Sequence, residues 1–261
     1  MKFIFDKYQS TGNDFILLDN REGTYNEITT GQVKKMCDRH FGIGADGLML
    51  LNNKKGFDFE MIYYNADGLE GSLCGNGGRS ITQFANKLGI KKKEYLFSAT
   101  DGNHKAMIDL DKEVKLQMSD VKNMEFSLDH YVLNTGSPHY VTYVKGLAEM
   151  DVVDEGRKIR NSKGFAKNGI NVNFGEVLGK DEIYVRTYER GVEDETLSCG
   201  TGVTASAIVS AHNENGFNRV EVKTKGGDLS VEFDKKSETE FVNIWLCGPA
   251  NFIFSGEIEL N

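Results

Sequence analysis

The chain contains one short motif twice, and this repetition constrains the fold more than any other feature of the sequence. NADGLEGSLCGNGGR occupies residues 65–79, and ERGVEDETLSCGTGVTA occupies residues 189–205. Each copy has an acidic turn with glycine, then Cys-Gly-x-Gly, then a segment suited to a helix. The two cysteines, Cys74 and Cys199, are separated by close to half of the 261 residues. A repeat this long predicts two similar halves rather than a solenoid.

Strand patterns dominate the remainder of the chain. Runs rich in β-branched and aromatic residues are mostly bounded by turns of Gly, Asn or Asp, as is typical of strands. These runs are 3–5, 16–18, 48–51, 114–118, 131–133, 140–144, 171–174, 183–188, 220–223, 229–233 and 241–246. Together with the helices that follow the two cysteines, they predict an α+β fold.

Each cysteine precedes a helical pattern of a different kind. After Cys74, apolar residues recur at the spacing of one helix face, and Gly89 is a suitable C-cap. The recurring residues are Ile81, Phe84, Ala85 and Leu88. After Cys199, the segment 203–212 is small and apolar almost all the way round. A helix without a polar face is expected to be buried inside its sheet.

Composition excludes several classes of protein. The chain carries 31 basic and 39 acidic residues, for a net charge of −8, so nucleic acid and anionic membranes are not expected partners. Four cysteines in a chain of this length do not indicate a disulfide scaffold. Asp6 interrupts the start before a signal-like apolar run develops, and the longest uncharged stretch, 196–213, is too polar for a membrane span. We therefore expect a cytoplasmic globular protein.

The two cysteines stand where helices are expected to begin. The first N–H groups of a helix have no partner inside it, and the helix dipole adds positive potential there. This setting favours a thiolate by lowering the thiol pKa from about 8.5, and the same N–H groups can bind a carboxylate. A single cysteine of this kind is more simply a buried structural residue. Its repetition in one motif favours a chemical role.

Two such cysteines suit the inversion of a carbon next to a carboxylate. Inversion requires removal of a proton from one face of the carbon and delivery of a proton to the other face. A thiolate and a thiol can perform these steps and exchange roles with the direction of reaction. Donors aimed at the carboxylate stabilise the charge that develops when the proton leaves.

Six segments together resemble the diaminopimelate epimerase family along nearly the whole chain. They are TGNDF (11–15), RHFGIGADGL (39–48), NADG…CGNGGR (65–79), GSPH (136–139), GINVNF (169–174) and YERG…ETLSCGTG (188–202). The resemblance implies two pseudosymmetric halves, each a curled, barrel-like sheet of mostly antiparallel or mixed strands around a central α-helix. The first half would be 1–119, carrying Cys74 and joined by the returning tail 249–261. The second would be 120–248, carrying Cys199.

The resemblance also implies an activity, the interconversion of LL- and meso-2,6-diaminopimelate in lysine and peptidoglycan precursor biosynthesis. Cys74 and Cys199 would be the acid–base pair, with no pyridoxal phosphate, metal or other cofactor. The expected partner is a small diamino dicarboxylic acid in the bacterial cytoplasm, and a homodimer stays open.

Substrate contacts follow from the resemblance by motif position. The residues implied are Asn13, Asn65, Gly75, Asn76, Asn171, Glu189, Arg190, Gly200 and Thr201. Gly75–Asn76 and Gly200–Thr201 would cradle the carboxylate at the reacting carbon, with Asn13 beside them. The others would hold the distal end of the substrate, where a guanidinium such as Arg190 can bind a carboxylate through two hydrogen bonds. His139 resembles a histidine beside the site.

Three departures from the family pattern concern the substrate. Gly47 stands where Gln is frequent, Ser137 stands where Asn is common, and the loop 191–196 is one residue longer than usual. Because these changes affect substrate fit more than thiol chemistry, a racemase of the same fold for another amino acid, such as histidine, is the closest alternative. A non-catalytic amino-acid-binding or thiol redox protein is the alternative from a different class. The polar contacts retained beside both cysteines disfavour it.

The segment GIGADG (42–47) also matches the glycine spacing of a dinucleotide-binding turn. That function requires a helix directly after the motif. The residues that follow, LMLLN, instead predict a strand. Cys37 and His40 are spaced like half of a zinc site, but no second pair accompanies them.

Overall fold

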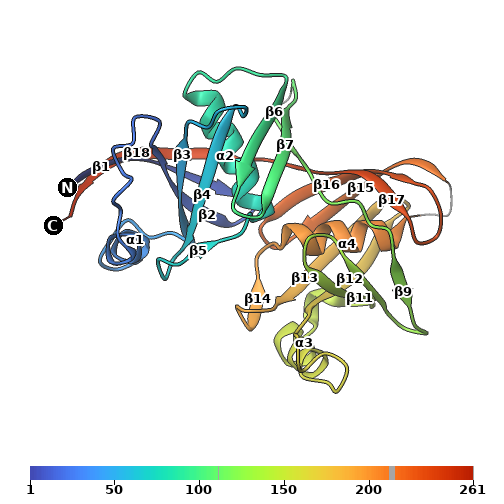
Figure 1. The fold of residues 1–261 in the computed structure, drawn as a ribbon. Helices are drawn as coiled ribbons and strands as arrows, with labels where there is room; N and C mark the ends of the chain where they lie inside the picture. Colours follow the sequence, from blue (N-terminus) through green and yellow to red (C-terminus); the bar gives the residue numbers. More distant parts are fainter. Residues whose placement is uncertain (111, 212–214, 261) are drawn as a thin grey trace. The chain divides into compact units, whose positions relative to one another are not determined.

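A computed structural model describes residues 1–110, 112–211 and 215–260 (Figure 1). The chain divides into two compact units, Met1–Leu116 with Pro249–Asn261, and Gln117–Gly248. The boundary expected at 119 and 120 lies a few residues beyond this division. In the described ranges, no helix is long and apolar enough to cross a membrane.

In the part of unit 1 that the structure describes, a mixed sheet is accompanied by two helices. Its strands are β1 (Lys2–Ser10), β2 (Asn13–Asp19), β3 (Gly47–Asn52), β4 (Phe59–Asn65), β5 (Glu70–Gly71), β6 (Glu94–Ala99), β7 (Gly102–Ile108), β8 (Val114–Gln117, which ends at the division) and β18 (Asn251–Glu259), and its helices are α1 (Thr30–Cys37) and α2 (Gly75–Lys87). Strands pair in the order β18, β1, β2, β3, β4, β6, β7, β8, with β5 also on β4. The β2–β3 and β4–β6 pairs are parallel, and the others are antiparallel.

Unit 2 repeats this arrangement. Its strands are β9 (Met124–Phe126), β10 (Tyr131–Asn134), β11 (Pro138–Tyr143), β12 (Asn171–Gly179), β13 (Glu182–Glu189), β14 (Asp194–Thr196), β15 (Gly216–Thr224), β16 (Gly227–Lys235) and β17 (Phe241–Gly248), and its helices are η1 (Leu147–Glu149), α3 (Val152–Arg160) and α4 (Gly200–Ser210). The pairing order is β9, β10, β11, β12, β13, β15, β16, β17, with β14 on β13. Here β11–β12 and β13–β15 are the parallel pairs.

The two units therefore share one topology, strand for strand. Strands β1 to β8 correspond in order to β10 to β17, α1 corresponds to α3, and α2 corresponds to α4. In both units the two parallel pairs fall at equivalent places in the order. This agreement confirms the predicted α+β fold of two similar halves with mixed sheets.

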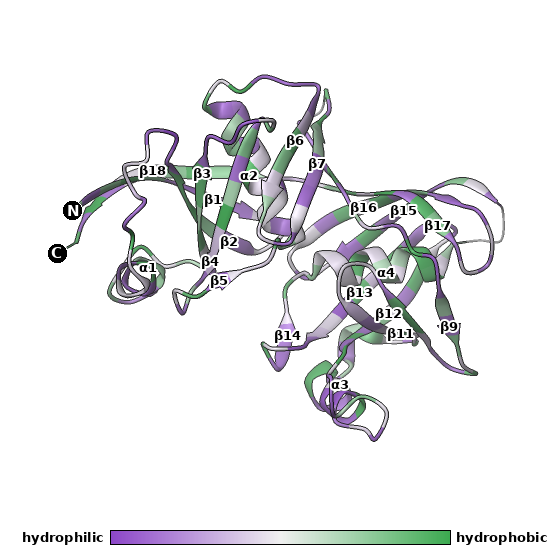
Figure 2. Ribbon diagram, in the orientation of Figure 1, coloured by the Kyte–Doolittle hydropathy of each residue, from purple (hydrophilic) through white to green (hydrophobic). Residues whose placement is uncertain are grey.

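Each unit curls its sheet around one helix. Helix α4 packs against β10, β11, β12, β13, β15, β16 and β17, and Figure 2 shows it mostly in white and green. Its side chains Val203, Ala205, Ala207 and Ile208 are almost completely buried with apolar residues of the surrounding strands. A helix so enclosed keeps no polar face, which confirms the expectation for this segment. The helix ends at Ser210, and His212, in the predicted range, lies outside the described residues.

Helix α2 is central to unit 1 in the same way. It packs against β1, β2, β3, β7 and β18. Ile81, Phe84 and Ala85 are buried as predicted. The helix ends at Lys87, with Leu88 as its C-cap and then Gly89 with φ of +91°. That left-handed conformation is one glycine adopts readily, so the predicted C-terminal end is confirmed.

Several elements lie outside the predicted runs. They are the helices η1, α1 and α3 and the strands β4, β5, β6, β7, β9, β14 and β18. The segment after GIGADG is strand β3, beginning at Gly47, so the helix required of a dinucleotide-binding turn is absent there.

Candidate active site

Cys74 occupies the N-cap of α2. Its backbone is extended, with φ of −96° and ψ of 135°, and its side chain makes no capping hydrogen bond to the helix. A Ser, Thr, Asp or Asn at this position would satisfy one of the first N–H groups. Cys74 is half-buried, whereas the following residues Gly75, Asn76, Gly77 and Gly78 are all buried. The thiol therefore stands at the positive end of an enclosed helix.

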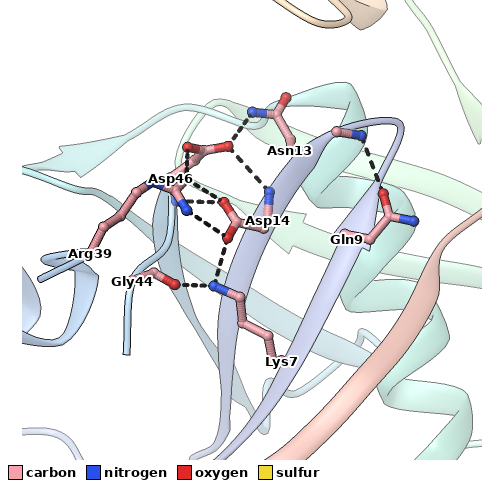
Figure 3. A network of polar contacts seen from close by, with 8 residues as sticks. Lys7, Gln9, Asn13, Asp14, Arg39, Gly44 and Asp46 are labelled. Carbon is pink, nitrogen blue, oxygen red and sulfur yellow. Dashed lines mark hydrogen bonds and ion pairs between the residues drawn. The ribbon is translucent and has the colours of Figure 1, made fainter. Parts of the chain in front are cut away.

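The first turn of α2 is tied to β2 through two asparagine side chains. Asn76 Nδ2 donates to Asn13 Oδ1 at 2.6 Å, and Asn76 Oδ1 accepts from Arg79 Nη2 at 2.8 Å. Asn13 Nδ2 in turn donates to Asp46 Oδ2 at 2.8 Å (Figure 3). The structure thus brings together Asn13 and Asn76, the two residues of unit 1 whose side chains the family resemblance assigns to the carboxylate of the substrate.

Gly47 and Asn65 are direct partners in the β3–β4 register. A Cβ atom at position 47 would lie 2.4 Å from Tyr63 Cε2 and 2.7 Å from its hydroxyl oxygen. The Tyr63 ring therefore fills the space that a side chain at position 47 would need. Asn65 is exposed, and its Nδ2 lies 3.5 Å from the Leu69 carbonyl.

Cys199 occupies the N-cap of α4, as Cys74 does in α2. Its backbone is extended, with φ of −108° and ψ of 109°, and it makes no capping hydrogen bond through its side chain. Its Sγ lies 3.5 Å from Thr201 Oγ1. Thr135 Oγ1 donates to the Thr201 carbonyl at 2.8 Å, which holds the first turn of the helix against the turn that joins β10 to β11.

Asn171 connects the other candidates of unit 2. Its Nδ2 donates to Ser137 Oγ at 2.8 Å, and its Oδ1 accepts the backbone N–H of Arg190 at 2.9 Å. The Arg190 guanidinium donates to the Asn168 carbonyl at 3.2 Å. Among the described residues, no carboxylate lies within ion-pair distance of Arg190, so its charge is available to a ligand.

Two buried titratable groups lie beside these residues. Burial raises the pKa of Glu189 above its usual value, while the nearby Thr196 hydroxyl opposes the rise. Burial lowers the pKa of His139 to about 3, and the positive charge of Arg190 adds to the lowering. His139 is completely buried, with Nδ1 3.0 Å from Asn173 Nδ2. Because the amide nitrogen is a donor, Nδ1 accepts, and the neutral ring carries its proton on Nε2.

The candidates of the two units fall at equivalent register positions. In unit 1 Gly47 pairs with Phe15 and Asn65. In unit 2 Asn171 pairs with His139 and lies opposite Glu189, one position beyond the Val172–Tyr188 pair. By the same count Asn13 matches Ser137, and the two cysteines match as helix caps. The predicted residues thus form two matching sets, one in each unit.

Sequence reasoning missed residues that hold the candidates in place. Asp46 binds Asn13, and Asn173, whose Oδ1 accepts from Thr187 Oγ1 at 2.9 Å, binds His139. Asp46 and Asn173 lie inside quoted motifs, so their proximity to the candidates was a usable signal. Tyr63 had none, because only the folded structure shows that its ring covers Gly47.

The loop that differs from the family pattern is anchored by charge. Glu195 in β14 receives two hydrogen bonds from Arg186, at 2.6 and 2.7 Å. Burial alone would raise the pKa of Glu195, but Arg186 and Lys225 hold it below its usual value.

The described residues contain no group of three His, Cys, Asp or Glu side chains arranged to hold a metal ion.

Three solved structures of other proteins share this fold at low sequence identity. A phenazine biosynthesis protein of the PhzF family from Bacillus anthracis has a TM-score of 0.77 with 15% identity, covering 100% of both chains. A probable proline racemase from Agrobacterium radiobacter has a TM-score of 0.68 with 13% identity, covering 99% of this chain and 93% of that one. A hydroxyproline epimerase from Agrobacterium vitis also has a TM-score of 0.68, with 12% identity, covering 98% and 91%.

Sequence comparison is more specific. The family model described as diaminopimelate epimerase matches residues 5–124 and 131–253. A protein of that name from Flavobacterium psychrophilum is 47% identical over 253 residues, covering 97% of this chain and 98% of the relative. Another from Chlorobaculum tepidum is 43% identical over 259 residues, covering 95% and 98%. With both cysteine motifs inside the matched ranges, the chain belongs to the diaminopimelate epimerase family.

Proposed function

We propose that this enzyme interconverts LL- and meso-2,6-diaminopimelate by moving protons at the α-carbon between Cys74 and Cys199. The observation that carries the proposal is the placement of both cysteines at equivalent helix N-caps, each next to a matching set of polar residues. A duplicated fold has no structural need for a thiol at both caps. Two acid–base groups are what an inversion requires.

The proton balance is closed by the two thiols alone. One cysteine, as the thiolate, takes the α-proton and becomes a thiol. The other, as a thiol, gives its proton to the opposite face of the carbon and becomes the thiolate. The reverse reaction starts from this second state, so neither direction needs an oxidant or a cofactor.

The first turns of α2 and α4 supply the donors for the carboxylate at the reacting carbon. Helix N-terminal N–H groups bind anions well, and Gly75 and Gly200 allow close approach of a ligand to that backbone. Asn13, Asn76 and Thr201 add side-chain groups beside them. Negative charge on the carboxylate increases as the α-proton leaves, so these donors stabilise the transition state more than the substrate.

The distal amino-acid end of the substrate is assigned to Asn65, Asn171, Glu189 and Arg190. Arg190 suits the second carboxylate because it forms no ion pair among the described residues. Glu189 suits the ammonium group, since a cation nearby offsets the cost of burying its carboxylate. His139 and Ser137 support this end through Asn173 and Asn171.

The proposal places the reaction in lysine and peptidoglycan precursor biosynthesis in the bacterial cytoplasm, with a small molecule as partner and no cofactor. The proposal also includes assembly of the chain into a homodimer, which sedimentation equilibrium would test.

Stereochemically resolved chromatography of LL-diaminopimelate after incubation with the enzyme tests the proposal. We expect conversion to the meso isomer by the wild type, and no conversion by Cys74→Ala or Cys199→Ala. Cys37→Ala is the matched control, because burial raises the pKa of Cys37 to about 12 and this thiol is remote from both caps in sequence. L-Histidine is tested as a second substrate. Racemisation of histidine without conversion of diaminopimelate would show that the substrate is a different amino acid. Full activity of either cysteine variant would show that the proton transfer does not depend on both thiols.

A further inference from the structure

The side-chain amides of Asn13 and Asn76 in unit 1 lie between one group that can only accept hydrogen bonds and one that can only donate them. A carboxylate such as Asp46 only accepts hydrogen bonds, and a guanidinium such as Arg79 only donates them. Between these two ends, Asn13 Nδ2 donates to Asp46 and its Oδ1 accepts from Asn76, while Asn76 Oδ1 accepts from Arg79. Turning either amide over would set donor against donor and acceptor against acceptor. The amide orientation of Asn13 is therefore fixed from both sides.

Asp46 is held in turn by charged neighbours (Figure 3). Arg39 Nη2 donates to Asp46 Oδ1 and to Asp14 Oδ1, both at 2.7 Å. The Asp14 backbone N–H donates to Asp46 Oδ2 at 3.2 Å. Lys7, which is almost fully buried, pairs with Asp14 Oδ2 at 2.8 Å and donates to the Gly44 carbonyl. These contacts leave the Asp46 carboxylate little freedom to move away from Asn13.

The four charged side chains around Asp14 and Asp46 also carry no net charge. Two acidic side chains, Asp14 and Asp46, are matched by two basic side chains, Lys7 and Arg39. Burial alone would raise the pKa of Asp14, but hydrogen bonds from Arg39 and Lys7 lower it to about 2. A carboxylate acceptor can thus stand behind Asn13 without adding net negative charge where the carboxylate of the substrate is to bind.

We propose that Asp46, held by Arg39, is a positioning residue that fixes the donor side of the Asn13 amide for the substrate carboxylate. Asp46 Oδ2 takes one hydrogen of Asn13 Nδ2, and the second hydrogen of that nitrogen is the one offered to the ligand. This inference rests on the proposed function, in which Asn13 contacts the carboxylate at the reacting carbon. Asp46 touches neither substrate nor thiol and acts only through Asn13.

A double-mutant cycle tests this dependence. Asp46→Asn replaces a carboxylate, which can only accept hydrogen bonds, by an amide. Since Arg39 donates to this position, the new amide oxygen is expected to face Arg39 and the amide nitrogen to face Asn13. We expect kcat/KM for LL-diaminopimelate to fall about 10- to 100-fold, the effect of losing a hydrogen bond to a charged group. In an Asn13→Ala background, the same substitution should change kcat/KM less than about twofold, because the residue through which it acts is gone.

Asp19→Asn is the matched control. Asp19 lies at the other end of β2 and makes a similar two-bond ion pair with Arg21, at 2.8 and 2.7 Å. It should lose a similar amount of stability and keep its kcat/KM. The rate of Cys74 alkylation by iodoacetamide should be the same in Asp46→Asn and the wild type across pH, since the thiol itself is not altered.

Arg39→Gln gives a second variant, suited to the case in which Asp46→Asn does not fold, because the Arg39 side chain is 56% exposed. It loosens Asp46 and leaves net negative charge in the network, so we expect a raised KM that increases further at low salt. Full additivity of Asp46→Asn with Asn13→Ala, or an unchanged KM in Arg39→Gln, would overturn the inference. An inactive wild type would instead reject the proposed function.

Discussion

Gly202 lies so close to Asn173 that a Cβ atom at position 202 would stand 2.2 Å from Asn173 Oδ1. The same amide donates to the Tyr140 carbonyl at 2.9 Å and contacts His139. The second glycine of the Cys-Gly-x-Gly motif therefore allows the first turn of α4 to rest on the polar residues of β12. This contact links the position of Cys199 to the strand that carries Asn171.

We expect Gly202→Ala to lower the free energy of unfolding by about 1–3 kcal/mol, as overpacking a tight contact does. Because the added methyl pushes the start of α4 away from β12, activity should fall at least about tenfold, given how strongly reaction depends on position. Urea unfolding and the epimerase assay measure the two effects. Gly164→Ala is the control, since nothing lies within 4 Å of its Cβ position. Equal results for the two variants would contradict the packing argument.

The stability of the protein should depend on pH through His139. The unfolded chain takes up a proton near pH 6.5, whereas burial holds the folded group neutral down to about pH 3. The unfolded state binds more protons between these values, so the free energy of unfolding falls by about 1.4 kcal/mol for each pH unit below 6.5. Glu189, whose pKa burial raises, acts in the opposite direction.

His139→Gln separates this contribution from the others. Between pH 7 and pH 5 the wild type should lose about 2 kcal/mol more than the variant, measured by urea unfolding at each pH. The other titratable groups are the same in both proteins, so their contributions to the pH dependence cancel in the difference. Parallel pH curves for the two proteins would show that His139 takes up its proton at the same pH in the folded and unfolded states, and would contradict this prediction.

Arg190→Gln should affect binding of the distal end of the substrate. Loss of a two-bond contact with a carboxylate is expected to raise KM for diaminopimelate about 10- to 100-fold. Arg219→Gln is the control, because that guanidinium is already paired with Glu221 and Glu232 on the surface. An unchanged KM in Arg190→Gln would move the distal carboxylate to another residue.

The repeated motif was sufficient to predict the two central helices and the similarity of the halves. Residues on the buried face of α2 recur at helical spacing, and α4 is uniformly small and apolar, so both patterns reflect their burial directly. Strand β18 gave no such signal because Phe252, Ile253 and Phe254, near its start, are consecutive apolar residues without the alternation of a half-buried strand, and all three are exposed. Helix α3 is short and contains Gly156, whose presence is explained only by contact with Tyr188.

The candidate site likewise contains residues that the sequence pattern could identify and residues that it could not. Cys74 and Cys199 were evident because each carries the motif itself. Asp46 and Asn173 contact Asn13 and His139 through hydrogen bonds that form only when separate segments of the chain meet. The meaning of Gly47 also depended on the fold, because the sequence does not show that the Tyr63 ring lies over it.

The most direct test of the account is the origin of the proton at the inverted carbon. LL-Diaminopimelate is incubated with the enzyme in D2O, and substrate and product are separated within the first few per cent of conversion. Two thiols predict deuterium at the inverted carbon of every meso molecule while the remaining LL substrate keeps its α-protons. Protium retained at the inverted carbon would mean that one group moves the same proton between faces, and it would contradict the assignment of Cys74 and Cys199 as a pair.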